Sequence, residues 1–140
     1  MKAFFDTSVL VRLFDGDLPD KQMAARALFA RHARAGDFLL SVQVLQEFYS
    51  AVTALIARPL VAASAVAAVS AFAELSVAQV DTRLVLAAAR RSQTDGLVYR
   101  DALIVETALM GGASVLYSEQ LTHGREFGTL RVENPFTVMA

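Results

Sequence analysis

Short apolar runs alternate with longer amphipathic segments along the whole chain. Each short run is bounded by Asp, Ser, Gly or Pro, which is typical of a buried strand that ends in a turn. Strands that alternate with helices form a parallel sheet, because parallel neighbours need a crossover connection that covers a face of the sheet. The sequence therefore predicts a three-layer α/β/α sandwich with a short central parallel sheet. The expected strands are 3–5, 38–40, 76–80, 114–117 and 130–132, and the expected helices are 9–14, 17–36, 42–57, 61–75, 82–94 and 100–110.

Length and composition limit the class of protein. The chain has 140 residues, which predicts a single domain over 1–140, and its 55% hydrophobic content excludes a disordered chain. A net charge of −1 excludes a polybasic nucleic-acid-binding tail, and the lack of cysteine excludes disulfides and thiol catalysis. The longest uncharged stretch, 59–73, is shorter than the ~20 residues that a membrane helix needs. We expect a cytoplasmic protein that does not bind membranes.

Four acidic residues do not lie where acids usually cap helices or face solvent. Asp6, Glu47, Asp101 and Glu119 follow an expected strand or lie in the first half of an expected helix. In a parallel α/β sheet these positions meet at the edge where such folds bind ligands. Clustered carboxylates need a neutralising cation, and a set of oxygen ligands without His or Cys favours Mg²⁺ or Mn²⁺. The four acids therefore predict a divalent-metal site.

The alternative is that these acids form separate ion pairs, for example with Arg12 or Arg100. Glu106 follows Asp101 on the same expected helix but lies about 140° away around it, so we expect Glu106 to be structural. His32 lies in a polar stretch of Arg and Ala, and we expect it to be exposed to solvent.

Four motifs follow one another at 4–11 (FFDTSVLV), 44–48 (VLQEF), 99–104 (YRDALI) and 115–119 (VLYSE). In this order and spacing they resemble the PIN-domain ribonucleases, and most closely the VapC-type toxins of bacterial toxin–antitoxin pairs. The closing run at 121–124 and 133–136 also resembles one branch of that family. The resemblance covers nearly the whole chain.

The resemblance implies a metal-dependent ribonuclease that hydrolyses RNA phosphodiester bonds and is held inactive by a cognate antitoxin. By position, it implies that Asp6 and Asp101 are the principal ligands of Mg²⁺ or Mn²⁺ and that Glu47 is a further catalytic acid. Thr7 and Ser118 would be hydroxyls that position these acids or the substrate phosphate.

One position departs from the family pattern. Many members have an Asp where this chain has Gln120, which carries no charge. Either the neighbouring Glu119 replaces the missing catalytic acid, or a second metal is held weakly. Gln120 also motivates the alternative of a catalytically weakened PIN-like module that binds RNA or protein.

A third hypothesis is a phosphate-transfer domain. A haloacid-dehalogenase-like phosphatase would need a second Asp at the position of Ser8, and a response-regulator receiver would need a late Lys, whereas no Lys follows Lys21.

The apolar content exceeds what one small sandwich needs for its interior. The segment 61–75 is apolar almost all round, and such a helix should be covered on both sides. We therefore expect the first four helices to line an exposed groove for an amphipathic antitoxin segment, and the protein to form a homodimer. The alternative is that these helices simply pack on each other. RNA would approach along arginines at the rim of the site.

Overall fold

The structure is a computed structural model in which residues 1–137 are described. Six strands and six helices alternate along most of this part of the chain. The strands are β1 (Lys2–Phe5), β2 (Phe38–Ser41), β3 (Ser76–Ala78), β4 (Ala113–Tyr117), β5 (Glu126–Phe127) and β6 (Leu130–Glu133). The helices are α1 (Thr7–Arg12), α2 (Pro19–Ala35), α3 (Val42–Ala54), α4 (Ala62–Ala73), α5 (Thr82–Asp95) and α6 (Tyr99–Met110).

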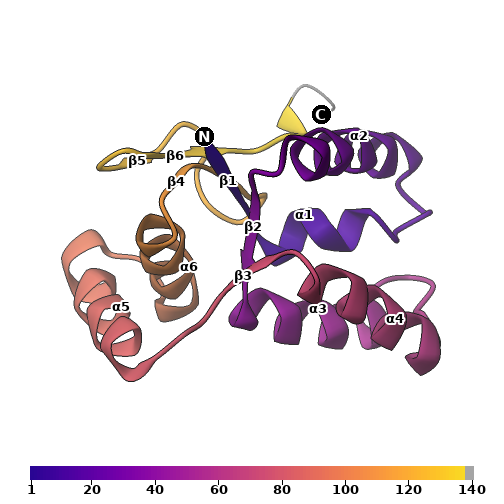
Figure 1. The fold of residues 1–140 in the computed structure, drawn as a ribbon, viewed down its shortest axis with the longest axis horizontal. Coiled ribbons are helices and arrows are strands. Elements are labelled where there is room, and N and C mark those ends of the chain that lie inside the picture. Colours follow the sequence, from indigo (N-terminus) through magenta and orange to yellow (C-terminus); the bar gives the residue numbers. More distant parts are fainter. Residues whose placement is uncertain (138–140) are drawn as a thin grey trace.

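The strands form one sheet in the order β3-β2-β1-β4-β6-β5. All neighbouring strands are parallel except β5, which pairs antiparallel with β6. In Figure 1, helices α1 to α4 lie on one side of strands β1 to β3, and α5 and α6 lie on the other. The predicted α/β/α sandwich is therefore confirmed. The sequence prediction missed β5, because a two-residue strand is too short to show a periodic pattern.

Capping residues set the starts and ends of several helices, including Asp6, which the sequence did not mark as a cap. The side chains of Asp6, Ser41 and Asp81 accept hydrogen bonds from the first turns of α1, α3 and α5. Gly36 ends α2 in the left-handed conformation that glycine adopts without strain. Helix α3 ends at Ala54, earlier than predicted, in the approach to Pro59, whose ring disfavours helix in the residue before it.

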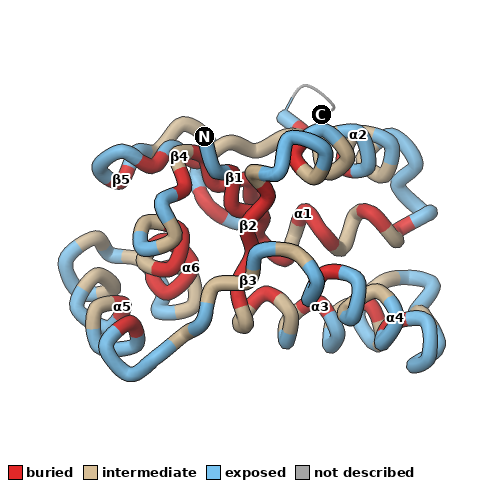
Figure 2. Tube along the Cα trace, in the orientation of Figure 1, coloured by how far each residue is buried: buried red, intermediate tan, exposed pale blue. Residues whose placement is uncertain are grey.

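An aromatic core holds the helices of one side against the sheet. Phe5 and Phe38 from the sheet contact Phe29 of α2, and Phe72 of α4 contacts both Phe29 and Phe48 of α3. Figure 2 shows the buried residues concentrated along the central strands and on the inner faces of the helices. This packing fixes the position of α3 relative to β1, and residues of the site described below lie on α3 and directly after β1.

Helix α4 is covered on one side only. It buries Ala65 and Phe72, while Val66 in the middle of the helix is 53% exposed and Val61 at its start is 70% exposed. In the part of the chain that is described, no helix is long and apolar enough to cross a membrane.

The interpretation of His32 as a solvated residue was wrong. Its side chain is only 5% exposed: Nδ1 lies 2.8 Å from Asp37 Oδ1, and Nε2 lies 3.1 Å from the Tyr117 hydroxyl. The ring also packs edge-on against Phe5. His32 therefore connects α2 to the sheet as a buried, hydrogen-bonded residue.

Candidate active site

Three of the four predicted acids meet at the carboxyl ends of the central strands. Asp6 follows β1 and caps α1, Glu47 lies on α3 after β2, and Asp101 lies in the first turn of α6. All three carboxylates hydrogen-bond to the guanidinium group of Arg100. We call Asp6, Glu47 and Asp101 the acid triad.

Asp6 is the most constrained member of the acid triad, and its side chain has no exposed surface. Its Oδ1 accepts from the Thr7 backbone N–H at 2.7 Å and from Arg100 Nη2 at 2.6 Å. Its Oδ2 accepts from the Ser118 hydroxyl at 2.7 Å and from Arg100 Nη1 at 3.2 Å. A carboxylate has about four acceptor sites, so these bonds occupy the whole group.

Glu47 is surrounded in a similar way, although its side chain is 30% exposed. Its Oε1 accepts from the Thr7 hydroxyl and from Arg100 Nη2, each at 2.7 Å, and its Oε2 accepts from Arg100 Nε at 3.0 Å. Burial raises the pKa of Glu47, but the hydrogen bonds from Arg100 and Thr7 outweigh burial and hold the pKa below its ordinary value. Glu47 is therefore ionised at neutral pH.

Asp101 makes a single contact with the guanidinium, from Arg100 Nη1 to Oδ1 at 3.1 Å, and its side chain is 18% exposed. Burial lowers the pKa of Arg100, but the hydrogen bonds to Asp6 and Glu47 outweigh burial and raise it. The Arg100 cation thus stands among three carboxylates, and the group keeps an excess of negative charge.

The donor chemistry of the acid triad fits a hard divalent cation, because every candidate ligand atom is a carboxylate oxygen. The buried Asp6 carboxylate requires a positive partner, and here the guanidinium of Arg100 supplies it. Within residues 1–137, no three Asp, Glu, His or Cys side chains are arranged to hold a metal ion. Asp6, Glu47 and Asp101 are the residues whose oxygens could hold Mg²⁺ or Mn²⁺.

The structure places Glu119 apart from the acid triad, although Glu119 and one member of the triad, Glu47, line the same pocket. Its carboxylate accepts from Arg12 Nε and from Lys21 Nζ, each at 2.8 Å. Burial raises the pKa of Glu119, but the hydrogen bonds from Lys21 and Arg12 outweigh burial and lower it. Glu119 is therefore already neutralised by two cations. The neighbouring Gln120 is exposed, and its backbone N–H donates to the Ser118 hydroxyl at 3.0 Å.

Glu106 lies away from the acid triad, as predicted. It forms an ion pair with Arg91 Nε at 2.7 Å, and Arg91 also binds Asp95 at 2.7 Å. This ion-pair group connects α5 to α6 on the opposite side of the sheet from α3.

Two residues of the site were not found by the sequence reasoning. Arg100 was considered only as a partner in separate ion pairs, whereas it binds three carboxylates at once. Gln43 donates to Glu47 Oε2 at 3.5 Å and to the Arg100 carbonyl at 3.3 Å. Its own amide oxygen is buried without a partner among residues 1–137. The helical spacing of Gln43 and Glu47 was the only sequence signal for this contact.

A pocket of about 920 Å³ opens beside the acid triad, and Glu47 is the triad member that lines it. Its polar end includes Thr7, Glu47 and Arg100, and its apolar wall is made by residues of α1, α3 and the segment after α3: Val11, Ala51, Leu55, Ile56 and Ala57. The expectation that the first four helices line a groove was too broad, because neither α2 nor α4 contributes a lining residue. Helix α4 packs behind α3 and does not reach the pocket wall.

Comparison with known proteins agrees with this architecture. The PIN domain family model matches residues 3–120. The VapC20 toxin of Mycobacterium tuberculosis, described as cleaving the sarcin–ricin loop, is 20% identical, with a TM-score of 0.66 over 84% of this chain and 88% of that one. A toxin–antitoxin complex from Klebsiella pneumoniae gives 18% identity and a TM-score of 0.71, over 96% and 98% of the two chains.

A DNA-bound VapBC complex from Salmonella typhimurium gives 18% identity and a TM-score of 0.66 over the same shares of the two chains. No curated protein sequence gives a significant match. At these identities, the likeness to the solved structures concerns the fold.

Proposed function

The chain belongs to the PIN-domain family, and we propose that it is a divalent-metal-dependent ribonuclease that serves as the toxin of a toxin–antitoxin pair. The acid triad carries this proposal. Three carboxylates from three separate elements meet at one cation position that opens into a pocket. The similar fold of a VapC toxin and of toxin–antitoxin complexes supports the same proposal, a ribonuclease toxin.

In this proposal, Asp6 and Asp101 hold Mg²⁺ or Mn²⁺, and Glu47 is the further catalytic acid. When bound, such an ion supplies charge neutralisation at the phosphate and activation of water. The Thr7 hydroxyl donates to Glu47 and the Ser118 hydroxyl donates to Asp6, so both orient carboxylates toward the cation position. None of the described residues that line the pocket is a histidine, which suits a reaction that does not rely on an imidazole base.

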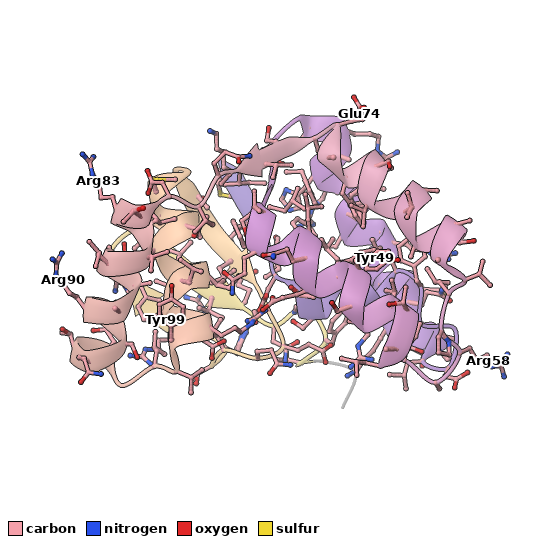
Figure 3. All side chains as sticks on the ribbon, turned by 90° about the horizontal axis from the view of Figure 1, so that it is seen from below. Tyr49, Arg58, Glu74, Arg83, Arg90 and Tyr99 are labelled. Atoms are coloured by element: carbon pink, nitrogen blue, oxygen red, sulfur yellow. The ribbon has the colours of Figure 1, made fainter. Side chains whose placement is uncertain are left out.

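The surface of the molecule offers groups that suit single-stranded RNA. Figure 3 shows Arg83 and Arg90 of α5 at one end of this view and Arg58 at the other, with Tyr49 and Tyr99 between them. The side chains of Tyr49 and Tyr99 are partly exposed, and aromatic rings of this kind stack on unpaired bases. Arginines bind phosphates, so they would hold the RNA backbone although the net charge is only −1. An RNA substrate also favours a cytoplasmic location.

The apolar wall of the pocket suits an amphipathic segment of an antitoxin. Leu55 in this wall is 79% exposed, and covering it would bury apolar surface next to a negatively charged end. The exposed Val61 and Val66 of α4 offer a separate apolar surface for a homodimer. Light scattering of the isolated protein tests the homodimer, and a monomer at micromolar concentration would refute it.

The experiment that tests the ribonuclease proposal is RNA cleavage by the purified protein with Mn²⁺ or Mg²⁺. Cleavage should need the divalent ion and should be lost in Asp6→Asn and Asp101→Asn. Glu106→Gln removes a carboxylate outside the pocket and serves as the control, so it should keep activity. Cleavage that persists in both Asp variants, or that is unaffected by a chelator, would refute the proposal.

A second candidate function is a PIN-like module that binds RNA or protein with weakened catalysis. Gln120 at the pocket favours it, because the amide brings no negative charge to the position where many relatives have Asp. This candidate predicts RNA retention on the wild-type protein with no cleavage at any Mn²⁺ concentration.

A further inference from the structure

We propose that Arg100 is an internal counter-ion of the acid triad, and that its guanidinium must leave the cation position before a divalent metal can bind. This inference rests on the proposed metal site and concerns how access to that site is controlled. The observation behind it is that one side chain of the protein itself occupies the place where the three carboxylates meet.

The guanidinium is bound along all of its donor edges. Nη1 and Nη2 form a two-bond pair with Asp6, at 3.2 and 2.6 Å, and Nε and Nη2 form a two-bond pair with Glu47, at 3.0 and 2.7 Å. Nη1 also donates to Asp101 at 3.1 Å. Such two-bond pairs between arginine and carboxylate are the strongest hydrogen-bonded ion pairs in proteins. Arg100 is therefore a specific occupant of this position.

Arg100 and a metal ion need the same acceptor sites. Both oxygens of Asp6 are filled by Arg100, Thr7 and Ser118, and the oxygens of Glu47 are filled largely by Arg100. A divalent ion that used these oxygens would also stand beside a fixed positive charge. The two cations therefore exclude each other at the acid triad.

The net charge of the group favours a divalent ion in competition with Arg100. Three carboxylates and one guanidinium leave a net charge of −2 in the group, from −3 for Asp6, Glu47 and Asp101 and +1 for Arg100. Arg100 thus stabilises the acids without neutralising them. A divalent cation brings more charge to the same position and would compete with a single guanidinium.

Arg100 has room to move away. Its side chain is 30% exposed and lines the open pocket, whereas the Asp6 side chain that it binds is completely buried. The backbone of Arg100 belongs to the first turn of α6, and its carbonyl accepts from Gln43 at 3.3 Å. Release therefore needs rotation of the Arg100 side chain and leaves the helix and the acids in place.

Competition with Arg100 lowers the apparent affinity of the acid triad for metal. When only a fraction of the molecules has Arg100 turned out, the apparent dissociation constant of the metal is raised by the inverse of that fraction. Removing the Arg100 side chain abolishes this competition. The variant should then bind the metal more tightly than the wild type, although it has lost ion pairs.

Arg91 provides a matched control within the same pair of helices. It also binds two carboxylates, Asp95 and Glu106, at 2.7 Å each, and its side chain is 23% exposed. Burial lowers the pKa of Arg91, but its hydrogen bonds to these acids raise it, as for Arg100. Arg91→Ala therefore removes a comparable ion pair without touching the acid triad.

The test measures Mn²⁺ binding directly, by the loss of the free-ion signal in electron paramagnetic resonance or by calorimetry. Arg100→Ala should lower the apparent dissociation constant at least about tenfold, whereas Arg91→Ala should leave it unchanged. Arg100→Lys keeps the charge but cannot bind two carboxylates through paired bonds. Its affinity should lie between those of the wild type and Arg100→Ala, and it replaces Arg100→Ala as the test if the latter does not fold.

The outcomes separate this inference from the proposed ribonuclease activity. Tighter Mn²⁺ binding by the Arg100 variants without RNA cleavage by any form would support the counter-ion role and refute the activity. Unchanged or weaker Mn²⁺ binding by the Arg100 variants would overturn the counter-ion role, even if the wild type cleaves RNA.

Discussion

Glu47 of the acid triad and Glu119 line one pocket, but the triad and Glu119 are neutralised in opposite ways. Three carboxylates of the triad share the single cation Arg100, whereas the Glu119 carboxylate binds both Arg12 and Lys21. Arg12 also pairs with Asp15, so that second group has as many positive as negative charges. The triad therefore retains the negative charge that attracts a metal, and Glu119 does not. The number of cations that contact an acid therefore distinguishes candidate metal ligands from structural acids better than the position of the acid at the edge of the sheet does.

The largest difference is expected on removing the acids of the triad. Asp6→Asn and Asp101→Asn should each lower RNA cleavage by at least about 100-fold, because they remove charge where the proposed metal neutralises the phosphate. Asp6→Asn should also lower the free energy of unfolding by about 3 kcal/mol, since it removes the charge of a fully buried carboxylate that is paired with Arg100. Cleavage rates and urea unfolding measure the two effects. An Asp6→Asn protein that cleaves RNA at the wild-type rate would contradict the comparison.

Glu119→Gln tests the other side of the comparison. If Glu119 replaces the missing acid at Gln120, this variant should be nearly inactive. The geometry favours a smaller effect, a loss of about 1–2 kcal/mol of stability from weakened hydrogen bonds to Arg12 and Lys21, with most of the activity retained. Parallel measurement of cleavage and unfolding decides between the two. Near-complete inactivity at unchanged stability would show that Glu119 belongs to the catalytic group.

Unfolding at acid pH should depend on the ion pairs of both Glu47 and Glu119. The pKa values of Glu47 and Glu119 lie below the ordinary value of 4.5, so the folded protein binds fewer protons near that pH than the unfolded chain. The stabilisation is fully present above 4.5 and is lost as the pH falls through the lowered values. Urea unfolding between about pH 6 and pH 3 should show this loss, and Glu47→Gln and Glu119→Gln should each make it shallower. A pH dependence equal to that of the wild type in either variant would contradict the assigned pairing.

The smallest effect is expected at Gln120, which is exposed at the pocket. Gln120→Asp adds a negative charge beside Ser118. It should lower the Mn²⁺ concentration for half-maximal cleavage by about threefold, because solvent screens much of the attraction between an exposed carboxylate and the ion. Gln120→Asn keeps the neutral amide and serves as the control. A rise in the Mn²⁺ requirement of Gln120→Asp would count against a metal position near this residue.

The fold could be predicted from the sequence because the patterns that indicate strands and helices lie within short stretches of the chain. Alternation of apolar runs with helical segments predicted the sandwich. Ser41 and Asp81 precede helices that begin where they were expected, whereas Asp6 caps a helix that begins at Thr7 and was expected from residue 9. Strand β5 was missed because it depends on pairing with β6. The end of α3 was placed too late because the apolar pattern continues through Leu55 and Ile56 after the helix has stopped.

The site was predicted less completely because charge partners come from distant parts of the chain. The positions of Asp6, Glu47 and Asp101 followed from topology. The partners of Glu119 did not, since Lys21 lies on α2 and reaches the loop after β4 across the fold. Arg100 binds the triad because its side chain points toward the three carboxylates. The sequence does not show the direction of that side chain, although Asp101 is its neighbour in the chain. The burial of His32 beside Tyr117 was not predicted either, because Tyr117 is distant from His32 in the sequence.

A crystal structure of the protein with Mn²⁺ would show where the metal binds, because the ion is located by its anomalous scattering. We expect one strong peak bound by Asp6 and Asp101, with the Arg100 side chain turned into the pocket and the Glu119 ion pairs with Arg12 and Lys21 unchanged. A peak bound by Glu119, with Arg100 still between the carboxylates of the acid triad, would contradict this expectation.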